Sequence, residues 1–472
     1  MKSESPRSTS ARSRLALGTA LLLVVAGAAG GLAWFGIVKH GEDRRSAELR
    51  QKRVVPFEPR DVVGLRVRLR GEEARLERKD GRWKLLAPVE ADADAVAVDQ
   101  LLSRLSGLER RARSAPAGEP AERLREYGLT DASTRIEVAL ADGSTLGLTL
   151  GESNGFDGTM FVQPASGEVQ VVGAGTRMDL EKTAFELRER RLLRFEPSSL
   201  ERIEVAGPRG PWSLAQAHGG WTLAARGLAE GERADPRRAE DVVAALRALQ
   251  ATAFEDGDPP AGKPAWEIHL AFAGGGEQRL SAWRPPGGGE VLVVRAPGQE
   301  QLARLPTSTL GALDVDPATL RDRRLLPVDR EQVTSVRLEV PASPADGFTL
   351  TRTPARQPGL PDEWKLTAPA PGPAEPWKAQ SLLFALTGLE AERIEDESGR
   401  AAAQSGLAPA ARTWVLVGAD GKEIGRLAVG RESRGELLVR SGASPRIWAV
   451  KKEKLDGLPK GPKDLAGSVP PG

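Results

Sequence analysis

Side chains that could carry acid–base, nucleophilic or metal chemistry are scarce in this sequence. Its 472 residues include no cysteine and only three histidines, His40, His218 and His269. The lack of cysteine excludes disulfide frameworks, thiolate metal sites, thiol nucleophiles and a lipidated-cysteine anchor. No base or nucleophile accompanies the histidines in a recognisable motif, so we treat them as incidental. We therefore expect no catalytic residue, no bound metal and no cofactor.

Two other motifs could suggest ligand binding. Asp92 and Asp94 lie just before a predicted helix, but no glycine and glutamate follow them at the spacing of a calcium loop. Acidic residues at this place favourably meet the helix dipole, so a capping role is predicted. The glycine-rich stretch 151–158 follows a predicted strand, yet no Gly-Lys-Ser/Thr follows it, and we do not expect a phosphate cradle.

A short segment rich in arginine recurs three times in one register, as Leu49–Phe57, Leu187–Phe195 and Leu320–Val328. We call these three stretches the basic segments. Their repeated cations are Arg50, Lys52 and Arg53, then Arg188, Arg190 and Arg191, then Arg321, Arg323 and Arg324. They could form a ladder of sites for an anionic polymer or lipid headgroup. Acids such as Glu189 and Asp322 flank them, however, so a solvated charged face is the favoured interpretation.

Tryptophans mark a second repeated position. Trp83, Trp221 and Trp364 are each followed two residues later by leucine, and we expect them to anchor hydrophobic cores rather than to stack on ligands. Three tryptophans have no counterpart in the other copies and are better candidates for a contact surface: Trp212, Trp283 and Trp377.

After each Trp-x-Leu segment the apolar residues follow the spacing i, i+1, i+4, i+7 of one helix face. These sets are Leu101, Leu102, Leu105 and Leu108, then Val242, Val243, Leu246 and Leu249, then Leu382, Leu383, Leu386 and Leu389. Alternating strands around Asp142-Gly143 and Asp420-Gly421 predict hairpins after the helix, and a further pair of short strands follows in each copy.

These patterns predict an α+β fold of three tandem repeat units. Each unit would hold an antiparallel meander, one amphipathic helix and a second antiparallel sheet. We place the units at residues 49–186, 187–319 and 320–460, followed by a flexible tail at 461–472. Unit 2 is degenerate, because it lacks the Tyr-Gly-Leu block (127–129) that corresponds to Ser-Gly-Leu (405–407) in unit 3.

The amino-terminal region has a different character. Residues 15–38 carry no charge and would span roughly 36 Å as a helix, enough to cross a bilayer. We predict a basic cytoplasmic leader at 1–14, a transmembrane signal anchor at 15–38 and a linker at 39–48, with the bulk of the chain on the periplasmic side of a bacterial inner membrane. The alternative is a signal peptide cleaved after Ala26-Gly27-Ala28.

Overall composition and charge indicate which kinds of binding partner are to be expected. The 40% apolar and 28% charged residues are typical of a globular protein. The net charge is +2, of which the leader supplies +3, so the remaining chain is close to neutral. Because nucleic-acid binding requires a concentrated basic surplus, no nucleic-acid partner is expected.

The Trp-x-Leu-x-x-Pro segments at 83–88 and 364–369, the amphipathic helix, the Tyr-Gly-Leu block and the closing Leu-Arg-x-Arg-Arg-Leu-Leu together resemble the bacterial family known as domain of unknown function 4340. The resemblance covers most of residues 45–460. It implies a single-pass, exported accessory protein of a gliding-type ABC transport system, and it supplies no catalytic residues.

We therefore expect a membrane-anchored, non-enzymatic binding protein whose partners are ABC-transporter subunits or other envelope proteins. Two alternatives stay open at this point. One is an envelope enzyme acting on peptidoglycan or polysaccharide, which would need a carboxylate pair or metal cluster in one copy. The other is a passive spacer between the membrane and a periplasmic partner.

Overall fold

A computed structural model describes residues 52–467, except 218, 286–287, 356–361 and 443. Within these residues no helix is both long and apolar enough to cross a membrane. The predicted leader, the predicted transmembrane segment at 15–38 and residues 49–51 of the first basic segment lie outside the described residues.

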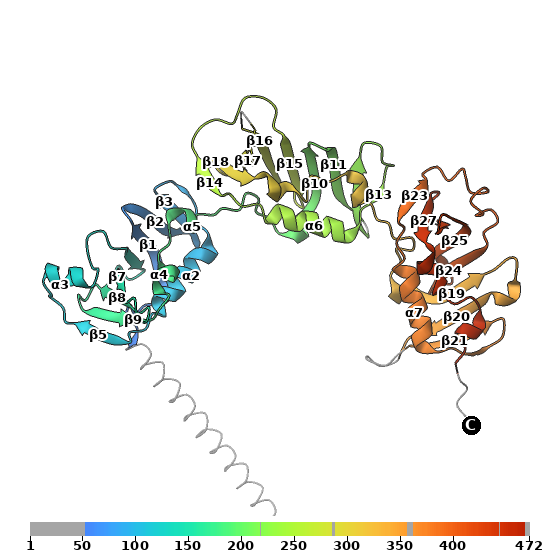
Figure 1. The fold of residues 1–472 in the computed structure, drawn as a ribbon, viewed down its shortest axis with the longest axis horizontal. Helices are drawn as coiled ribbons and strands as arrows, with labels where there is room; N and C mark the ends of the chain where they lie inside the picture. The colour runs from blue at the N-terminus through green and yellow to red at the C-terminus, as the bar shows by residue number, and fades with distance from the viewer. Residues whose placement is uncertain (1–51, 218, 286–287, 356–361, 443, 468–472) are drawn as a thin grey trace, which may run out of the picture. The chain divides into compact units, whose positions relative to one another are not determined.

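The first repeat contains nine strands (Figure 1). They are β1 Val62–Leu69, β2 Glu72–Lys79, β3 Arg82–Ala87, β4 Ala91–Asp92, β5 Ala112–Ala115, β6 Arg135–Leu140, β7 Thr145–Ser153, β8 Met160–Pro164 and β9 Val169–Val172. Its helices are η1 Pro59–Asp61, α2 Ala95–Ser106, α3 Ala121–Glu126, α4 Thr176–Leu180 and α5 Ala184–Leu187.

The second repeat has the same order of strands. They are β10 Leu200–Gly207, β11 Gly210–Ala217, β12 Gly220–Ala225, β13 Glu232–Arg233, β14 Ala253–Glu255, β15 Trp266–Phe272, β16 Glu277–Trp283, β17 Val291–Arg295 and β18 Leu302–Pro306. Its helices are η2 Pro197–Ser199, α6 Pro236–Arg247, η3 Thr307–Leu310 and η4 Pro317–Leu320.

The third repeat completes the series. Its strands are β19 Val333–Glu339, β20 Phe348–Thr353, β21 Glu363–Ala368, β22 Gly372–Pro373, β23 Arg393–Asp396, β24 Arg412–Gly418, β25 Glu423–Ser433, β26 Glu436–Ser441 and β27 Ile447–Lys451. Its helices are η5 Arg330–Gln332, η6 Pro344–Asp346, α7 Pro376–Thr387, α8 Lys452–Asp456 and η7 Pro462–Asp464.

The predicted fold class is wrong: each repeat is built on one nine-stranded antiparallel sheet, not on an α+β unit with two sheets. The strand order is β4-β3-β2-β1-β6-β7-β8-β9-β5, and the other two sheets repeat it strand for strand. The reason is that the first strand of the meander pairs with the first strand after the helix, for example β1 with β6 through Val67 and Ile136. This pairing satisfies the backbone groups along what would otherwise be two exposed sheet edges. The predicted transmembrane helix forms no part of the described fold.

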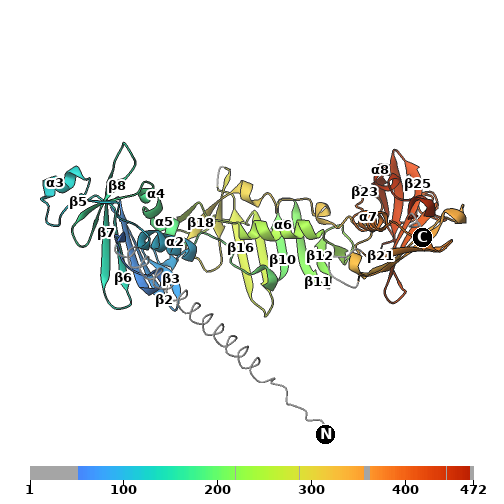
Figure 2. The same cartoon turned by 90° about the horizontal axis from the view of Figure 1, so that it is seen from below.

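The predicted amphipathic helices and the predicted hairpins are confirmed in the three repeats. Each repeat has one twelve-residue helix, which lies against a face of its sheet (Figures 1 and 2). The apolar face of α2 is buried at Leu101, Leu102 and Leu105, and Leu382, Leu383 and Leu386 are buried in α7. Burial of a leucine side chain stabilises the fold by roughly 2 kcal/mol, so this face largely determines how the helix packs.

By its internal contacts the described chain divides into two compact units. The first contains the first repeat with residues 246–265 and 279–309, and the second contains residues 196–245, 266–278 and 310 onwards. One hydrophobic core lies in the first repeat, around Trp83, Val98 and Leu148, and another lies in the third repeat, around Trp364, Leu386 and Trp414.

The Tyr-Gly-Leu block packs against the end of the second hairpin strand. A Cβ on Gly128, whose φ is +68°, would lie 2.6 Å from the Glu152 nitrogen. A Cβ on Gly151 would lie 2.3 Å from the Tyr127 carbonyl oxygen. Two glycines are thus required where these backbones meet. In the third repeat a Cβ on Gly430 would approach the Ser405 carbonyl oxygen in the same way, at 2.2 Å.

The second and third basic segments each connect two repeats through their backbone. In the second, the Asp94 amide donates to the Leu187 carbonyl and the Glu189 amide to the Asp92 carbonyl, which closes the first repeat. Three residues later the Leu192 amide donates to the Leu249 carbonyl, and this bond attaches the basic segment to the second repeat. The third basic segment repeats both sets of bonds, with Leu320 and Leu325 in place of Leu187 and Leu192.

The chain end supplies the same closing contact for the third repeat. Glu375 donates its amide to the Leu465 carbonyl, and the Gly467 amide donates to Pro373. Leu465 is fully buried. Residues 461–467, for which we expected a flexible tail, therefore pack against the third repeat at the position that a fourth basic segment would occupy.

Candidate functional site

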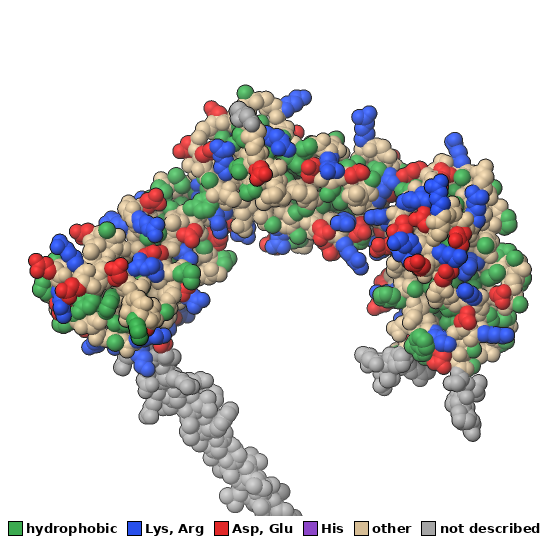
Figure 3. Space-filling model, viewed as in Figure 1, with side chains coloured by type: hydrophobic (Ala, Val, Ile, Leu, Met, Phe, Trp, Pro, Cys, Tyr) green, Lys and Arg blue, Asp and Glu red, His purple; other side chains and the backbone are tan. Residues whose placement is uncertain are grey.

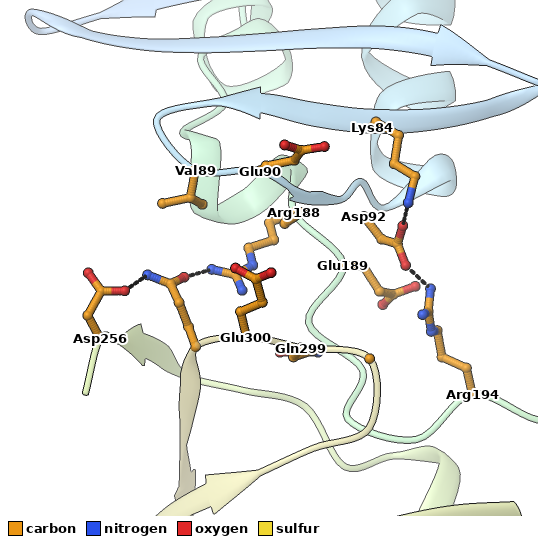
Figure 4. Close-up of a pocket in the computed structure, with 13 residues that line it drawn as sticks. Lys84, Val89, Glu90, Asp92, Arg188, Glu189, Arg194, Asp256, Gln299 and Glu300 are labelled. Carbon is orange, nitrogen blue, oxygen red and sulfur yellow. Dashed lines mark hydrogen bonds and ion pairs between the residues drawn. The ribbon is translucent and has the colours of Figure 1, made fainter. Parts of the chain in front are cut away.

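The second basic segment lines a pocket of about 470 Å³ in the first compact unit (Figure 4). The first repeat contributes Lys84 and 89–92, the basic segment contributes Arg188, Glu189 and Arg194, and the loops around β14 and β18 contribute Asp256 and 298–301. The pocket thus brings together charged side chains from segments more than 200 residues apart in the sequence.

Arg188 lies at the centre of one cluster in this pocket. Its guanidinium donates to the Gln301 side-chain oxygen, and the Gln301 amide nitrogen donates to Asp256 at 2.8 Å. The same guanidinium lies 3.4 Å from the centre of the Phe254 ring, a cation–π contact. Burial lowers the pKa of Arg188, and Asp256 counteracts part of this effect.

Asp92 forms the second cluster of the pocket, between Lys84 and Arg194 (Figure 4). The Arg194 Nη1 lies 2.7 Å from Asp92 Oδ2, and Lys84 binds the other oxygen. Burial disfavours the charged form of Asp92, but the hydrogen bonds from Lys84 and Arg194 outweigh it, so the pKa of this carboxyl is lowered. Asp92 is therefore an ion-pair partner, whereas Asp94 caps α2 as predicted.

An equivalent pocket of about 670 Å³ lies at the third basic segment, within the second compact unit. There Arg446 donates to both oxygens of Glu232 and, at 2.6 Å, to Glu397. Arg321 donates to the other oxygen of Glu397 at 2.7 Å. Glu232, Arg321 and Arg446 are all largely buried. Hydrogen bonding to Glu232 raises the pKa of Arg446.

The two clusters occupy equivalent positions. Just before β14, the Thr252 amide donates to the Arg304 carbonyl, three residues after Gln301. Just before β23, the Glu392 amide donates to the Ala449 carbonyl, three residues after Arg446. The junction between two repeats at the second basic segment thus has the neutral Gln301 amide at the position where the junction at the third basic segment has the Arg446 guanidinium. Where Arg446 is present, its additional partner is Glu232, in the strand equivalent to β4.

The first cation of the second and third basic segments lies neither on a solvated face nor in an open anion site. Arg188 and Arg321 are 7% and 8% exposed, and both are held by the side chains just described. Arg191 forms a bidentate pair with the buried Glu189, and Arg324 pairs with Asp322 in the same way. The favoured interpretation from sequence is therefore wrong for Arg188 and Arg321, which join neighbouring segments of the fold, whereas Arg191 and Arg323 are exposed.

The repeated tryptophans are confirmed as core residues in two of the three copies. Trp83 and Trp364 are 4% and 3% exposed, but Trp221 is only half-buried. In the second repeat the neighbouring strand β11 instead carries a buried tryptophan, Trp212, and Trp266 in β15 is also buried. Of the three candidates for a contact surface, Trp212 is thus buried, Trp283 is half-buried and Trp377 is exposed.

Trp377 belongs to an exposed aromatic pair on α7. It is 64% exposed, and Phe384, seven residues along the same helix, is 62% exposed. Gln380 and Ser381 lie between them on the same face, which therefore carries no charge. The guanidinium of Arg330 lies 4.7 Å from the Phe384 ring centre, and the Lys378 ammonium 5.7 Å from that of Trp377.

The first two repeats show what this helix face carries elsewhere. The second and ninth residues of α2 are Val96 and Ser103, and those of α6 are Arg237 and Ala244. Trp377 and Phe384 occupy these positions in α7. On the face drawn in Figure 3, charged side chains of both signs are interspersed over the surface. The aromatic pair is thus a feature of the third repeat alone.

Among the histidines, only His269 lies in the described part of the chain. His269 lies 3.3 Å from Glu204 and 3.1 Å from Glu277, on neighbouring strands. His40 and His218 lie outside the described part of the chain. In that part no group of three or more histidine, aspartate or glutamate side chains is placed to hold a metal ion.

Comparison with protein families identifies the family of this chain. The model of the domain of unknown function DUF4340 matches residues 83–265 and 364–468, more than half of the chain. The chain belongs to the DUF4340 family. Both matched DUF4340 regions begin at the tryptophan of a Trp-x-Leu segment, Trp83 and Trp364. The comparison with curated proteins finds no match.

Sequence reasoning missed the side chains that complete the two junctions of this DUF4340 protein. Gln301, Arg446 and Glu232 carry no motif, and their partners lie far away in the sequence. The one available signal was the acid-x-Arg pattern of the basic segments, Glu189 with Arg191 and Asp322 with Arg324. This pattern indicates that the acid and the arginine form an ion pair. It does not indicate which distant segment Arg188 or Arg321 contacts.

Proposed function

We propose that this DUF4340 protein is a binding protein without catalytic activity, attached to the bacterial inner membrane and acting on its outer side as an accessory protein of a gliding-type ABC transport system. Its role would be to bind another envelope protein. Membership of the DUF4340 family and the uncharged residues 15–38 support this proposal.

The exposed aromatic pair of α7 is the observation that carries the proposal. Exposed tryptophan and phenylalanine side chains are enriched at the centres of protein interfaces, where they bury large areas. The stripe between Trp377 and Phe384 is uncharged, and Lys378 and Arg330 lie against the two rings. This arrangement fits a partner protein that presents an apolar patch with carboxylates at its rim.

The charge distribution at the repeat junctions supports a structural role for the buried arginines. The buried cations Arg188, Arg321 and Arg446 are each engaged by a side chain of a neighbouring segment. The junctions therefore serve to hold the repeats together while the surfaces of the sheets and helices remain open to a partner.

The test is chemical cross-linking followed by affinity purification of the full-length protein from detergent-solubilised membranes. The variant W377R/F384A gives α7 the residues that α6 carries at these positions, and we expect it to lose the partner. The matched control V96R/S103A makes the same changes in α2, and we expect it to retain the partner. Far-ultraviolet circular dichroism would establish that both variants are folded.

Two results would contradict the proposal. If the unaltered protein recovers no transporter subunit, the association with an ABC system is wrong. If W377R/F384A recovers the same partner in the same yield, the aromatic face is not the binding surface.

A further inference from the structure

A basic pocket of about 830 Å³ opens on the first repeat. It is lined by the end of α2, the segment 107–111 that follows this helix, and α4 with Lys182. Its cations are Arg104, Arg110, Arg111 and Lys182, and its acids are Glu109 and Asp179. The lining thus carries a net positive charge, which suits an anionic ligand.

The cations of this pocket are only weakly neutralised by the protein itself. Arg104 Nε lies 3.9 Å from Asp179 Oδ2, a long contact between two side chains that are both substantially exposed. Lys182 donates to the neutral carbonyl of Met178 at 3.1 Å. In the described part of the chain, Arg110 and Arg111 form no ion pair within 4.0 Å, and Arg111 interacts with the Asp157 carboxylate only at longer range. These guanidinium groups are therefore available to an external anion.

The pocket is specific to the first repeat, and the chain itself provides the comparison. Backbone bonds fix the equivalent positions, because Arg110 donates its amide to Lys52 as Ala251 does to Arg190 and Ala391 to Arg323. The pairs that correspond to Arg110-Arg111 are thus Ala251-Thr252 and Ala391-Glu392. Arg104 is likewise replaced by Ala245 in α6 and Ala385 in α7. Arg104, Arg110 and Arg111 are therefore present in the first repeat and are replaced by uncharged or acidic residues in the other two.

This repeat directly follows the uncharged amino-terminal segment. Residues 15–38 carry no charge, and the Lys52 carbonyl at the pocket is only fourteen residues further on. The intervening residues 39–51 include Lys39, Arg44, Arg45 and Arg50. A membrane surface that held residues 15–38 would therefore lie within reach of the pocket.

Two exposed apolar side chains lie on segments next to the same pocket. Met178 is 76% exposed and belongs to α4, whose Thr176 and Asp179 line the pocket. Phe156 is 98% exposed, at the tip of the loop 154–158. This loop packs near the pocket, since a Cβ on Gly158 would lie 3.3 Å from Ala174, which follows the pocket residue Gly173.

We propose that this face of the first repeat docks onto an anionic phospholipid bilayer. Lipid phosphates would accept hydrogen bonds from Arg104, Arg110, Arg111 and Lys182, while Met178 and Phe156 enter the boundary between headgroups and acyl chains. The inference deepens the proposed attachment to a membrane and rests on it. It adds that the folded first repeat itself contacts lipid.

The experiment uses the full-length protein reconstituted into vesicles. Because the chain contains no cysteine, Met178→Cys carries a single environment-sensitive fluorophore. We expect a blue-shifted emission and quenching by a lipid-borne quencher in vesicles of phosphatidylglycerol and phosphatidylcholine, but not in phosphatidylcholine alone. Added salt should reverse the quenching. A label at Glu72→Cys, in β2 towards the other end of the sheet, should not be quenched.

The decisive variant is R110A/R111T, which gives the first repeat the residues of the second. We expect the ratio of docked to undocked protein to fall by roughly thirtyfold, from the usual contribution of two basic residues near an anionic surface. Unchanged thermal unfolding would show that the repeat stays folded. Equal quenching in neutral and anionic vesicles, or quenching that survives R110A/R111T, would overturn the inference. Because only protein and lipid are present, this outcome is independent of whether a transporter partner is found.

Discussion

Arg446 donates to both oxygens of the Glu232 carboxylate, although 214 residues separate the two in sequence. Glu232 lies in the short strand β13 of the second repeat, and Arg446 precedes β27 of the third. Both side chains are nearly inaccessible to solvent. The contact joins consecutive repeats at the third basic segment, where their backbones are also hydrogen-bonded.

Removal of Arg446 should strongly destabilise the second compact unit. In Arg446→Ala the buried Glu232 carboxylate would keep only the Arg321 Nε, 4.0 Å away. Leaving a buried charge without its partner costs about 3–5 kcal/mol. Chemical denaturation should show this loss. The double variant E232L/R446M, which removes both charges, should be more stable than Arg446→Ala, and a double variant that is less stable would contradict this account.

Removal of Arg188 should cost less than removal of Arg446. Its acceptor Gln301 is neutral and keeps its hydrogen bond to Asp256, so Arg188→Ala leaves no buried charge unpaired. We expect a loss of about 2 kcal/mol, from one hydrogen bond and the cation–π contact with Phe254. Thermal unfolding of the two alanine variants side by side tests the difference. A loss at Arg188 equal to that at Arg446 would mean that the junctions do not differ as described.

Asp94 should contribute to stability as the cap of α2. Its carboxylate accepts hydrogen bonds from the Val96 and Ala97 amides at 3.0 and 3.1 Å. Asp94→Ala should therefore lower the free energy of unfolding by about 1 kcal/mol, whereas Asp94→Asn, which can still accept, should have little effect. Urea denaturation measures both. Equal losses in the two variants would indicate that charge, not capping, is responsible.

Asp396 should stabilise the third repeat only above acidic pH. Its carboxylate accepts hydrogen bonds from the Ala401 amide and from Ser398, which lower its pKa from 3.8 to about 2. A carboxyl with a depressed pKa in the folded state stabilises above its unfolded pKa, and this stabilisation is lost as pH falls towards 2.

A carboxyl-carbon NMR titration of Asp396 should accordingly show a midpoint near 2. Asp396→Asn should be less stable than the unaltered protein at pH 7, and the difference should shrink as the solution is acidified. A midpoint close to 3.8, or a difference that does not depend on pH, would show that these hydrogen bonds do not form in solution.

Features that depend on neighbours along the chain could be predicted from the amino-acid sequence alone. The threefold repeat, the apolar face of α2 at Leu101 and Leu105, the cap at Asp94 and the hairpin between β6 and β7 follow from local spacing, because helices and hairpins are closed by short-range hydrogen bonds. Trp83 was identified as a core residue for the same reason.

How these pieces join could be learned only from the folded chain. The pairing of β1 with β6 merged two expected sheets into one, because two sheet edges with unpaired backbone groups are more stable when they bond to each other. Likewise, the burial of Arg321 and the bond from Arg446 to Glu232 have no local signal, since each side chain's partner is brought close only by folding. The basic segments can be recognised from the sequence by their recurring arginines. Their role in connecting the repeats depends on long-range packing and can be seen only in the folded chain.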